Sequence, residues 1–334
     1  HTATWPHEKV IFKGKRVGVI GTGSSAIQSI PLIAEEAAHV YVFQRTPNYA
    51  VPAHNAPLDP DYVREFKAQY AENRAKAKKL VAGFLCHYNS QSALEVSEAE
   101  RRRKYDARWA RGGLSFLGSF SDIHSDLEAN QTASAYIHDK IHEIVDDPKT
   151  ADLLTPNSVL GCKRLCVDTD YYKTFNRDNV SLIDVRSSPI ERITAAGVVV
   201  AGQEHEIDML VLATGFDAIT GALKRIDIRG RGGLALNEKW QDGPKSYLGL
   251  AIAGFPNLFT ITGPGSPSVL TNMLPSIEQH VDWIADCLGH MRKNDLGLIE
   301  ATAEAEDGWV ALNDSEARAT LRYDCASWYL GANV

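Results

Sequence analysis

Long apolar runs are missing from this sequence of 334 residues. No stretch of about eighteen consecutive apolar residues occurs, and the opening HTATWPHEKV has no apolar core of the kind that a signal peptide requires. We therefore expect no membrane-spanning helix and no membrane partner, and we expect the protein in the cytoplasm. The length of the chain is enough for two domains that each bury a core, and its 44% of hydrophobic residues is ordinary for a globular protein.

Cysteine is scarce. The five cysteines are an odd number and are scattered, except for Cys162 and Cys166 in the segment GCKRLC. This pattern argues against a disulfide framework and fits a reducing compartment. A redox or zinc site at this pair is disfavoured by its spacing and by the lack of further ligands nearby. His138 and His142 stand four apart without the glutamate of an HExxH motif, so we predict no metal site.

Net positive charge is also absent. The formal net charge of -7 argues against a general nucleic-acid-binding protein. The segment RRRKYDARWAR at 101–111 is strongly basic, but acidic residues precede it at Glu95, Glu98 and Glu100. We expect this segment to be a solvated helix face, and we predict no nucleic-acid partner.

A β-α-β unit is predicted at residues 15–45. The apolar run 17–20 indicates a buried parallel strand, which meets a glycine-containing turn. An amphipathic helix then continues to about residue 37, and a second strand follows at 39–43. This order of elements is the one in which a dinucleotide-binding fingerprint carries meaning.

The fingerprint itself is Gly21-x-Gly23-x-x-Ala26. In this pattern the first glycine allows a tight turn, the second lets a pyrophosphate approach the backbone, and a small third residue lets the helix pack closely on the strand. Free N–H groups at the start of the helix receive the phosphate. A glycine turn that binds nothing is the alternative.

The residues after the second strand indicate which nucleotide is bound. An NAD site places an acidic residue there to hold the ribose 2′-hydroxyl. This chain has Gln44, Arg45 and Thr46 instead. A cation at that position suits a 2′-phosphate, so NADP is favoured over NAD or FAD.

Further elements follow from composition and periodicity. The chain is helix-like and charged from about 61 to 147. Strands are predicted at 180–184, 189–194, 197–202 and 208–217. The last strand runs into Thr214 and Gly215, at the strand end where open α/β sheets bind ligands. Beyond it we expect two strands, a Gly/Pro/Ser loop and an amphipathic helix within 247–288, and a second helix over 301–321.

Together these motifs resemble the Baeyer–Villiger monooxygenases, which are class B flavoprotein monooxygenases, nearly from end to end. The family fingerprint FxGxxxHxxxW is followed by Pro or Asp, and the chain opens on its second half with His1, Trp5 and Pro6. The family's other marks follow in order: GTGSSA, FQRTP, the KRL of GCKRLC, LATGFD, GPGSPS and SWYLGANV. The loop GPGSPSVLTNM is similar to the loop of phenylacetone and steroid monooxygenases.

The resemblance implies an activity. NADPH reduces FAD, O2 forms a C4a-peroxyflavin, and one oxygen atom is inserted next to the carbonyl of a small-molecule ketone, giving an ester or lactone. The family's catalytic arginine falls on Arg164 and its NADP-phosphate lysine on Lys163. A guanidinium keeps its charge when partly buried, so it can hold the negative charge of the peroxide and of the adduct. The cysteines beside it are then bystanders, and a surface salt bridge is the alternative role for Arg164.

The same resemblance assigns the remaining site residues. Cofactor binding falls on Gly21, Thr22, Gly23, Ser24, Ser25, Arg45, Thr46, Lys163, Thr214, Gly215, Met273 and Trp328. The ketone pocket and flavin edge fall on Phe216, Ser268, Val269 and Leu270. Ordinary core packing is the alternative for the apolar members of this set.

The fold class that we expect is α/β. A Rossmann-like NADP-binding domain spans 7–215, a helical insertion interrupts it at 58–155, and the C-terminal portion of an FAD-binding domain spans 216–334. The family's first dinucleotide motif is not in this chain, so we expect an interior piece of a larger enzyme whose turnover needs the absent residues. An NADPH-dependent flavin reductase and a non-catalytic NADP-binding module are the alternatives.

Overall fold

The computed structural model describes residues 1–86, 88–266, 271–324 and 326–327. These residues form two compact units. Unit 1 holds residues 1–56, 88–216, 321–324 and 326–327, and unit 2 holds residues 57–86 and the described part of 217–320. The domain limits drawn from the sequence stay a prediction.

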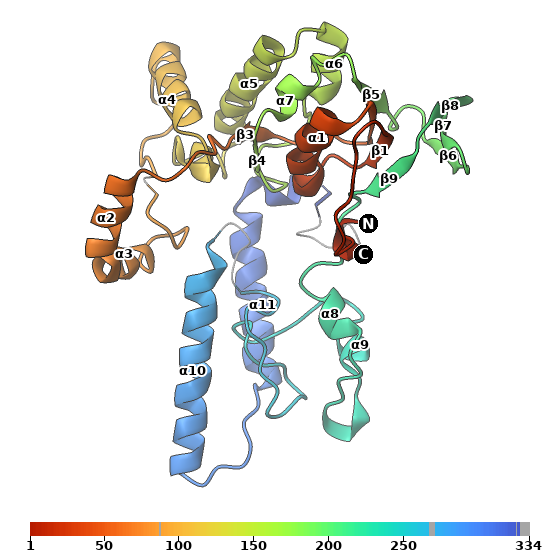
Figure 1. Ribbon diagram of the computed structural model, residues 1–334. Coiled ribbons are helices and arrows are strands. Elements are labelled where there is room, and N and C mark those ends of the chain that lie inside the picture. Colours follow the sequence, from red (N-terminus) through yellow and green to blue (C-terminus); the bar gives the residue numbers. More distant parts are fainter. Residues whose placement is uncertain (87, 267–270, 325, 328–334) are drawn as a thin grey trace. The chain divides into compact units, whose positions relative to one another are not determined.

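A four-stranded parallel sheet lies at the centre of unit 1 (Figure 1). Its strand order is β5–β2–β1–β9. The strands are β1 (Arg16–Ile20), β2 (His39–Gln44), β5 (Val180–Asp184) and β9 (Met209–Leu212). Each falls where the sequence predicts a strand. The α/β class with a parallel sheet is confirmed.

Helix α1 (Ser24–Glu36) connects β1 to β2 and covers the sheet. Its buried positions are Ala26, Ile27, Ile30, Pro31, Ile33 and Ala34. These recur every three or four residues, so they form one face of the helix. That face meets apolar side chains of β1 and β2. Phe43 of β2 belongs to a second apolar cluster, with Val198 and Val200. The strands are therefore covered on both sides, which is why their sequences are rich in apolar residues.

Smaller sheets complete unit 1. Strands β3 (Ala50–Pro52) and β4 (Cys166–Asp168) pair in parallel, and neither is predicted from the sequence. An antiparallel sheet contains β6 (Ile190–Ile193), β7 (Gly197–Val200) and β8 (Gln203–Glu206). The first two of these are predicted, whereas the polar QEHE of β8 gives no apolar signal.

Helices fill most of the segment from 61 to 147, as expected. Unit 1 has α4 (Glu98–Arg111) and α5 (Leu127–Ile144), followed by α6 (Pro148–Leu154) and α7 (Tyr171–Thr174). Unit 2 has α2 (Pro60–Ala68) and α3 (Tyr70–Ala77). The basic segment 101–111 lies on α4. There Arg102 forms ion pairs with Asp139 and Glu143 of α5, so acidic groups offset part of this positive charge.

Unit 2 also contains the C-terminal helices. These are α8 (Gly221–Lys224), α9 (Leu236–Lys239), α10 (Met273–Lys293) and α11 (Ala303–Arg318). The prediction of two strands between 247 and 262 is wrong. The structure has only the isolated bridges Tyr247↔Ala251 and Ala251↔Phe259 in that segment. A strand needs a continuous ladder of backbone hydrogen bonds, and the described residues supply no partner strand there.

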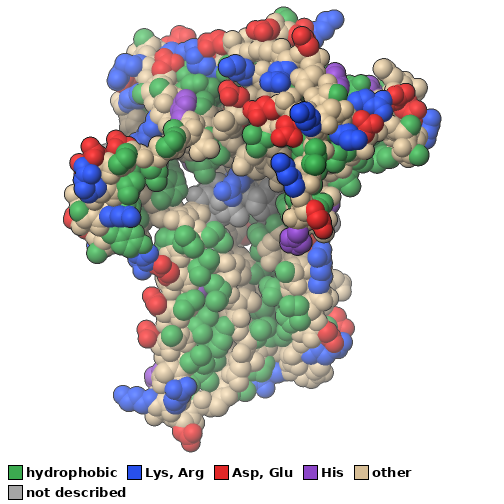
Figure 2. All heavy atoms as spheres, viewed as in Figure 1, with side chains coloured by type: hydrophobic (Ala, Val, Ile, Leu, Met, Phe, Trp, Pro, Cys, Tyr) green, Lys and Arg blue, Asp and Glu red, His purple; other side chains and the backbone are tan. Residues whose placement is uncertain are grey.

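Helix α10 exposes much of its apolar surface. The exposed fractions are 66% for Leu274, 46% for Val281, 41% for Trp283 and 47% for Leu288. Figure 2 shows hydrophobic side chains gathered over this part of the molecule. Among the described residues, none of the helices combines the length and the apolar character that crossing a bilayer demands.

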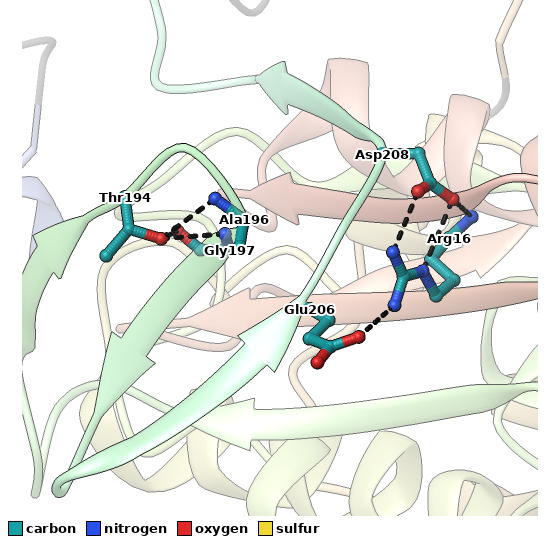
Figure 3. A network of polar contacts seen from close by, with 6 residues as sticks. All are labelled: Arg16, Thr194, Ala196, Gly197, Glu206 and Asp208. Atoms are coloured by element: carbon teal, nitrogen blue, oxygen red, sulfur yellow. Dashed lines mark hydrogen bonds and ion pairs between the residues drawn. The ribbon is translucent and has the colours of Figure 1, made fainter.

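Arg16 ties the start of β1 to the chain that leads into β9 (Figure 3). Its backbone N–H donates to Asp208 Oδ2 at 2.8 Å, and its Nη2 lies 2.8 Å from Asp208 Oδ1. Its Nη1 forms an ion pair with Glu206. The same figure shows the turn between β6 and β7, where Thr194 Oγ1 accepts hydrogen bonds from the N–H groups of Ala196 and Gly197.

We predict that the contact between Arg16 and Asp208 gives the protein a pH-dependent stability. Hydrogen bonds from Arg16 lower the pKa of Asp208 from 3.8 to about 2. A lowered carboxyl pKa stabilises the folded state above the unfolded pKa, and this contribution is lost as pH falls through the folded pKa. Asp208→Asn should therefore lower Tm at pH 7, and the difference from wild type should shrink as pH falls below about 4.

Circular dichroism melting curves between pH 7 and pH 3 test this prediction. Asp178→Asn is the matched control, because Asp178 is exposed and makes no ion pair with any described residue. A difference in Tm between Asp208→Asn and wild type that stays constant over the whole range would contradict the assigned pKa shift.

Candidate nucleotide-binding site

Gly21 brings the end of β1 against the end of β9. Its φ is 110°, a region that favours glycine, and a Cβ at this position would lie 2.3 Å from the carbonyl oxygen of Ala213. The N–H of Ala213 donates to Ile20 O at 2.9 Å, and the N–H of Gly21 donates to Phe43 O at 3.2 Å. The glycine turn and the Ala213–Thr214–Gly215 segment therefore lie side by side, at the carboxyl ends of neighbouring parallel strands.

Gly23 leaves the start of α1 open. It is the N-cap residue of α1 and has no side chain to cap the helix. A Cβ added at Gly23 would meet nothing within 4 Å. The first N–H groups of a helix lack partners inside the helix, so an unobstructed helix start can bind an anion such as a pyrophosphate. Ser25 at this end is exposed, and Ser24 Oγ lies 3.2 Å from Cys166 Sγ.

Thr22 fixes the loop that follows β2. Its buried hydroxyl donates to Thr46 O at 2.7 Å, and its carbonyl accepts a hydrogen bond from the Asn48 side chain at 2.8 Å. The segment that contains Lys163 is joined to the same loop, because Cys166 N donates to Tyr49 O at 3.0 Å where β3 and β4 begin. Hydrogen bonds to main-chain carbonyls thus link the glycine turn to the two segments predicted to hold a 2′-phosphate.

Lys163 lies in a positively charged environment. Burial lowers its pKa, and the charges of Arg45 and Arg186 lower it further. None of these three side chains forms an ion pair with a described residue. Like charges without acidic partners are unfavourable by themselves, and a bound anion would relieve the repulsion. The donor set therefore fits a phosphate group.

Arg164 is exposed and forms no ion pair with any residue that the structure describes. The alternative of a surface salt bridge thus finds no partner in that part of the chain.

The neighbouring cysteines are not bonded to each other, because Cys166 is a free thiol and Cys162 is disulfide-bonded. The cysteine count did not predict a disulfide at Cys162. Burial raises the pKa of the Cys166 thiol, which disfavours a reactive thiolate.

The fingerprint histidine meets the LATGFD motif. His1 Nε2 lies 3.2 Å from Thr214 Oγ1. The rings of His1 and Phe216 meet edge-on, with their centroids 6.0 Å apart. His1 Nδ1 accepts a hydrogen bond from Ala3 N, so a neutral ring carries its proton on Nε2 and donates it to Thr214. The ring centroids of Trp5 and Phe12 lie 6.3 Å apart, and Pro6 is exposed.

The remaining predicted residues divide into two sets. Met273 is the first residue of α10 in unit 2, and Gly215 has a φ of 100°. Ser268, Val269, Leu270 and Trp328 lie outside the described residues. His138, one of the two histidines considered as metal ligands, stacks on Tyr49 with ring centroids 5.8 Å apart. No group of three His, Cys, Asp or Glu side chains in the described ranges is placed to hold a metal ion.

Two alanine substitutions should separate the roles of the two glycines. Gly21→Ala places a Cβ against Ala213 O at a strained φ, so we expect it to destabilise the fold by about 1–3 kcal/mol or more. Gly23→Ala has room for its Cβ, so Tm should stay close to wild type while NADPH binding weakens at least several-fold. Thermal melting and NADPH titration measure both effects. A Gly23→Ala variant that binds NADPH like wild type would contradict the role given to the start of α1.

Comparison with known proteins identifies relatives of this chain. No protein-family model matches the chain. A Baeyer–Villiger monooxygenase of Pseudooceanicola batsensis is 42% identical over 337 residues, which cover 100% of this chain and 61% of that protein. A steroid monooxygenase solved with bound NADP is 52% identical with a TM-score of 0.95, and the match covers 99% of this chain and 64% of that one.

A third match is the solved OTEMO complex with FAD and NADP. It is 35% identical with a TM-score of 0.95 and is covered over 63% of its length. The chain thus spans less than two thirds of the length of each of these three proteins. The similarity to a steroid monooxygenase agrees with the branch that the GPGSPSVLTNM loop predicts. Over the part of their length that it spans, the chain is a homologue of the Baeyer–Villiger monooxygenases.

Proposed function

We propose that this chain supplies the NADP-binding part of a Baeyer–Villiger monooxygenase. The whole protein would use NADPH, FAD and O2 to insert one oxygen atom next to the carbonyl of a small ketone, giving an ester or lactone. The observation that carries the proposal is the group of cations Lys163, Arg45 and Arg186, which form no ion pairs with described residues and lie beside a glycine turn. The chain is also 42% identical to a Baeyer–Villiger monooxygenase and 52% identical to a steroid monooxygenase. The activity is proposed for the whole protein because the chain spans only 61% to 64% of these two relatives.

The nucleotide fits the residues at the glycine turn. The pyrophosphate would lie against Gly23, where no atom occupies the position of a Cβ, and would accept hydrogen bonds from the first N–H groups of α1. The 2′-phosphate would lie between Arg45, Thr46 and Lys163. Because the pKa of Lys163 is lowered, a bound dianion would also favour its charged form.

FAD supplies the redox and oxygen chemistry when it is bound. The chain has one flanked dinucleotide fingerprint, which we assign to NADP. For the flavin, Thr214, Gly215 and Met273 are the contributions that we propose from this chain. The hydrogen bond from His1 holds the Thr214 hydroxyl in place.

Arg164 would hold the negative charge that develops on oxygen as the ketone reacts. Its planar guanidinium offers several donors in a fixed geometry, which the single ammonium group of a lysine does not. One preorganised donor of this type is worth about 2.7–4 kcal/mol. Phe216, Ser268, Val269 and Leu270 are the proposed contacts for the ketone. We propose a ketone and O2 as partners, no nucleic-acid or membrane partner, and a cytoplasmic location.

Product analysis tests the function. The whole protein is incubated with NADPH, ¹⁸O2 and cyclohexanone, and the products are analysed by gas chromatography with mass detection. The proposal predicts a lactone that carries one ¹⁸O atom. Oxidation of NADPH without a labelled lactone, repeated over a panel of linear, cyclic and aromatic ketones, would instead support a flavin reductase. In parallel, quenching of flavin fluorescence shows whether the 334-residue chain binds FAD.

Arg164→Ala in the whole protein tests the catalytic assignment. We expect lactone formation to fall by about 10²- to 10³-fold, because one charge-stabilising group is lost. NADPH affinity should change less than twofold. Arg192→Ala is the control, because Arg192 is an exposed arginine of β6 that forms an ion pair with Glu191. Lactone formation at the wild-type rate in Arg164→Ala would overturn the role of Arg164.

A further inference from the structure

We propose that Arg186 is a third cation for the 2′-phosphate of the nucleotide and a determinant of the preference for NADPH over NADH. The inference rests on the proposed function, because it concerns the same nucleotide site. Arg186 is not among the residues that the sequence motifs assign. It follows β5, the strand at the edge of the parallel sheet beside β2.

Strand register brings Arg186 to the edge of the sheet where Arg45 also lies, at the carboxyl ends of β2 and β5. In the β2–β5 pairing, Gln44 lies opposite Asp184. The hydrogen bonding continues one residue further, where Val185 N donates to Gln44 O at 2.9 Å. Parallel strands end at the same edge, so Arg45 and Arg186 both leave the sheet where β2 and β5 end.

A tight turn fixes the backbone of Arg186. Asp184 Oδ1 accepts a hydrogen bond from Arg186 N at 2.8 Å, and Asp184 Oδ2 accepts one from Ser187 Oγ at 2.6 Å. The bond from Ser187 is the main cause of the lowered pKa of Asp184, and the charge of Arg186 adds to it. The carboxylate is thus occupied by the turn. It forms no ion pair with the Arg186 side chain, which is exposed.

The charges of three separate segments act on one another at this edge. Lys163 precedes β4, Arg45 follows β2, and Arg186 follows β5. Both arginines are close enough to Lys163 for their charges to lower its pKa. Elsewhere in the described residues, arginines such as Arg16 and Arg102 form ion pairs with acidic groups. A cluster of three cations without such partners matches a phosphate monoester, which carries a charge of about -1.5 to -2 near pH 7.

The matching ligand is the 2′-phosphate of a dinucleotide rather than free phosphate. Arg45 belongs to the loop that Thr46 ties to Thr22 of the glycine turn, so the cations stand next to the site proposed for the pyrophosphate. A ligand that reaches both sites carries a phosphate at each end of its adenosine ribose. NADPH has this arrangement, whereas NADH lacks the phosphate at the 2′ position.

Binding titrations with the purified chain test the inference. Kd values for NADPH and NADH are measured by quenching of tryptophan fluorescence, at two salt concentrations, for wild type, Arg186→Ala and Arg186→Lys. Arg186→Ala should weaken NADPH binding about five- to tenfold, the size expected for one lost charge-assisted contact at an exposed site, and NADH binding less than twofold. The salt dependence of the NADPH affinity should also decrease, because one fewer charge is screened.

Controls make the result specific to the charge of Arg186. Arg186→Lys should retain more NADPH affinity than Arg186→Ala. Arg192→Ala should leave both affinities unchanged. Competition with inorganic phosphate and with adenosine 2′,5′-bisphosphate identifies the ligand: the bisphosphate should displace NADPH at a far lower concentration than phosphate. Equal displacement by the two would reduce the site to one for free phosphate and would overturn the inference.

The outcomes separate the inference from the proposed function. If the wild-type chain binds NADPH more tightly than NADH and Arg186→Ala keeps the same ratio, the role of Arg186 fails while the nucleotide site stands. If the wild-type chain shows no preference for NADPH, the nucleotide site fails and the inference fails with it. Equal weakening of both nucleotides in Arg186→Ala would also overturn the inference. Tm values for each variant identify any general loss of folding, which we do not expect because the Asp184 turn uses the main chain of residue 186.

Discussion

The close approach of β1 and β9 at Gly21 is the constraint on which the nucleotide site depends. A carbonyl oxygen, that of Ala213, occupies the space beside Gly21 that any other residue would fill with its Cβ. The turn can therefore follow β1 directly, and α1 can start with its N–H groups open. Thr214, which follows Ala213 in the chain, lies at the same end of the sheet, and the His1 side chain forms a hydrogen bond with its hydroxyl. One missing side chain thus sets the positions of the turn, the helix start and the LATGFD motif.

Backbone hydrogen bonds, rather than side-chain ion pairs, carry the positive charges to this edge. The ladder between β2 and β5 and the short pairing of β3 with β4 hold the three segments that carry the cations. Cations held close together without acidic partners destabilise the folded protein relative to one in which they are paired. A bound anion removes this penalty, so ligand binding and folding are thermodynamically linked at this site.

Local patterns were enough to predict the β-α-β unit and most of its neighbours. The apolar runs and the glycine spacing identify β1, α1 and β2, and the run VSLID identifies β5. The sequence motifs do not point to the proposed role of Arg186, for a different reason. Its position is informative only once β5 is known to lie beside β2, and strand order is a long-range property that periodicity does not encode. The segment DVRSS, in which Asp184 ends β5 and a turn follows, would have been a candidate if that order had been known.

The incorrect strands between 247 and 262 have the converse cause. Segments such as YLGLAIAG are apolar and suit a strand, but a strand exists only with a hydrogen-bonded neighbour. Within the site, the motifs also could not show that Arg164 is exposed, because exposure depends on residues distant in sequence.

If Arg45, Lys163 and Arg186 bind the 2′-phosphate as we propose, their separation along the chain has an evolutionary consequence. Each cation sits on its own loop, anchored by its own strand end, so a change at one codon leaves the other two in place. A lineage could drift at any single position and keep most of its discrimination between nucleotides. Conversion to NADH would require substitutions at several distant codons, none of which brings the full benefit alone. Cofactor choice in such a protein is therefore buffered against mutation by the topology of its sheet.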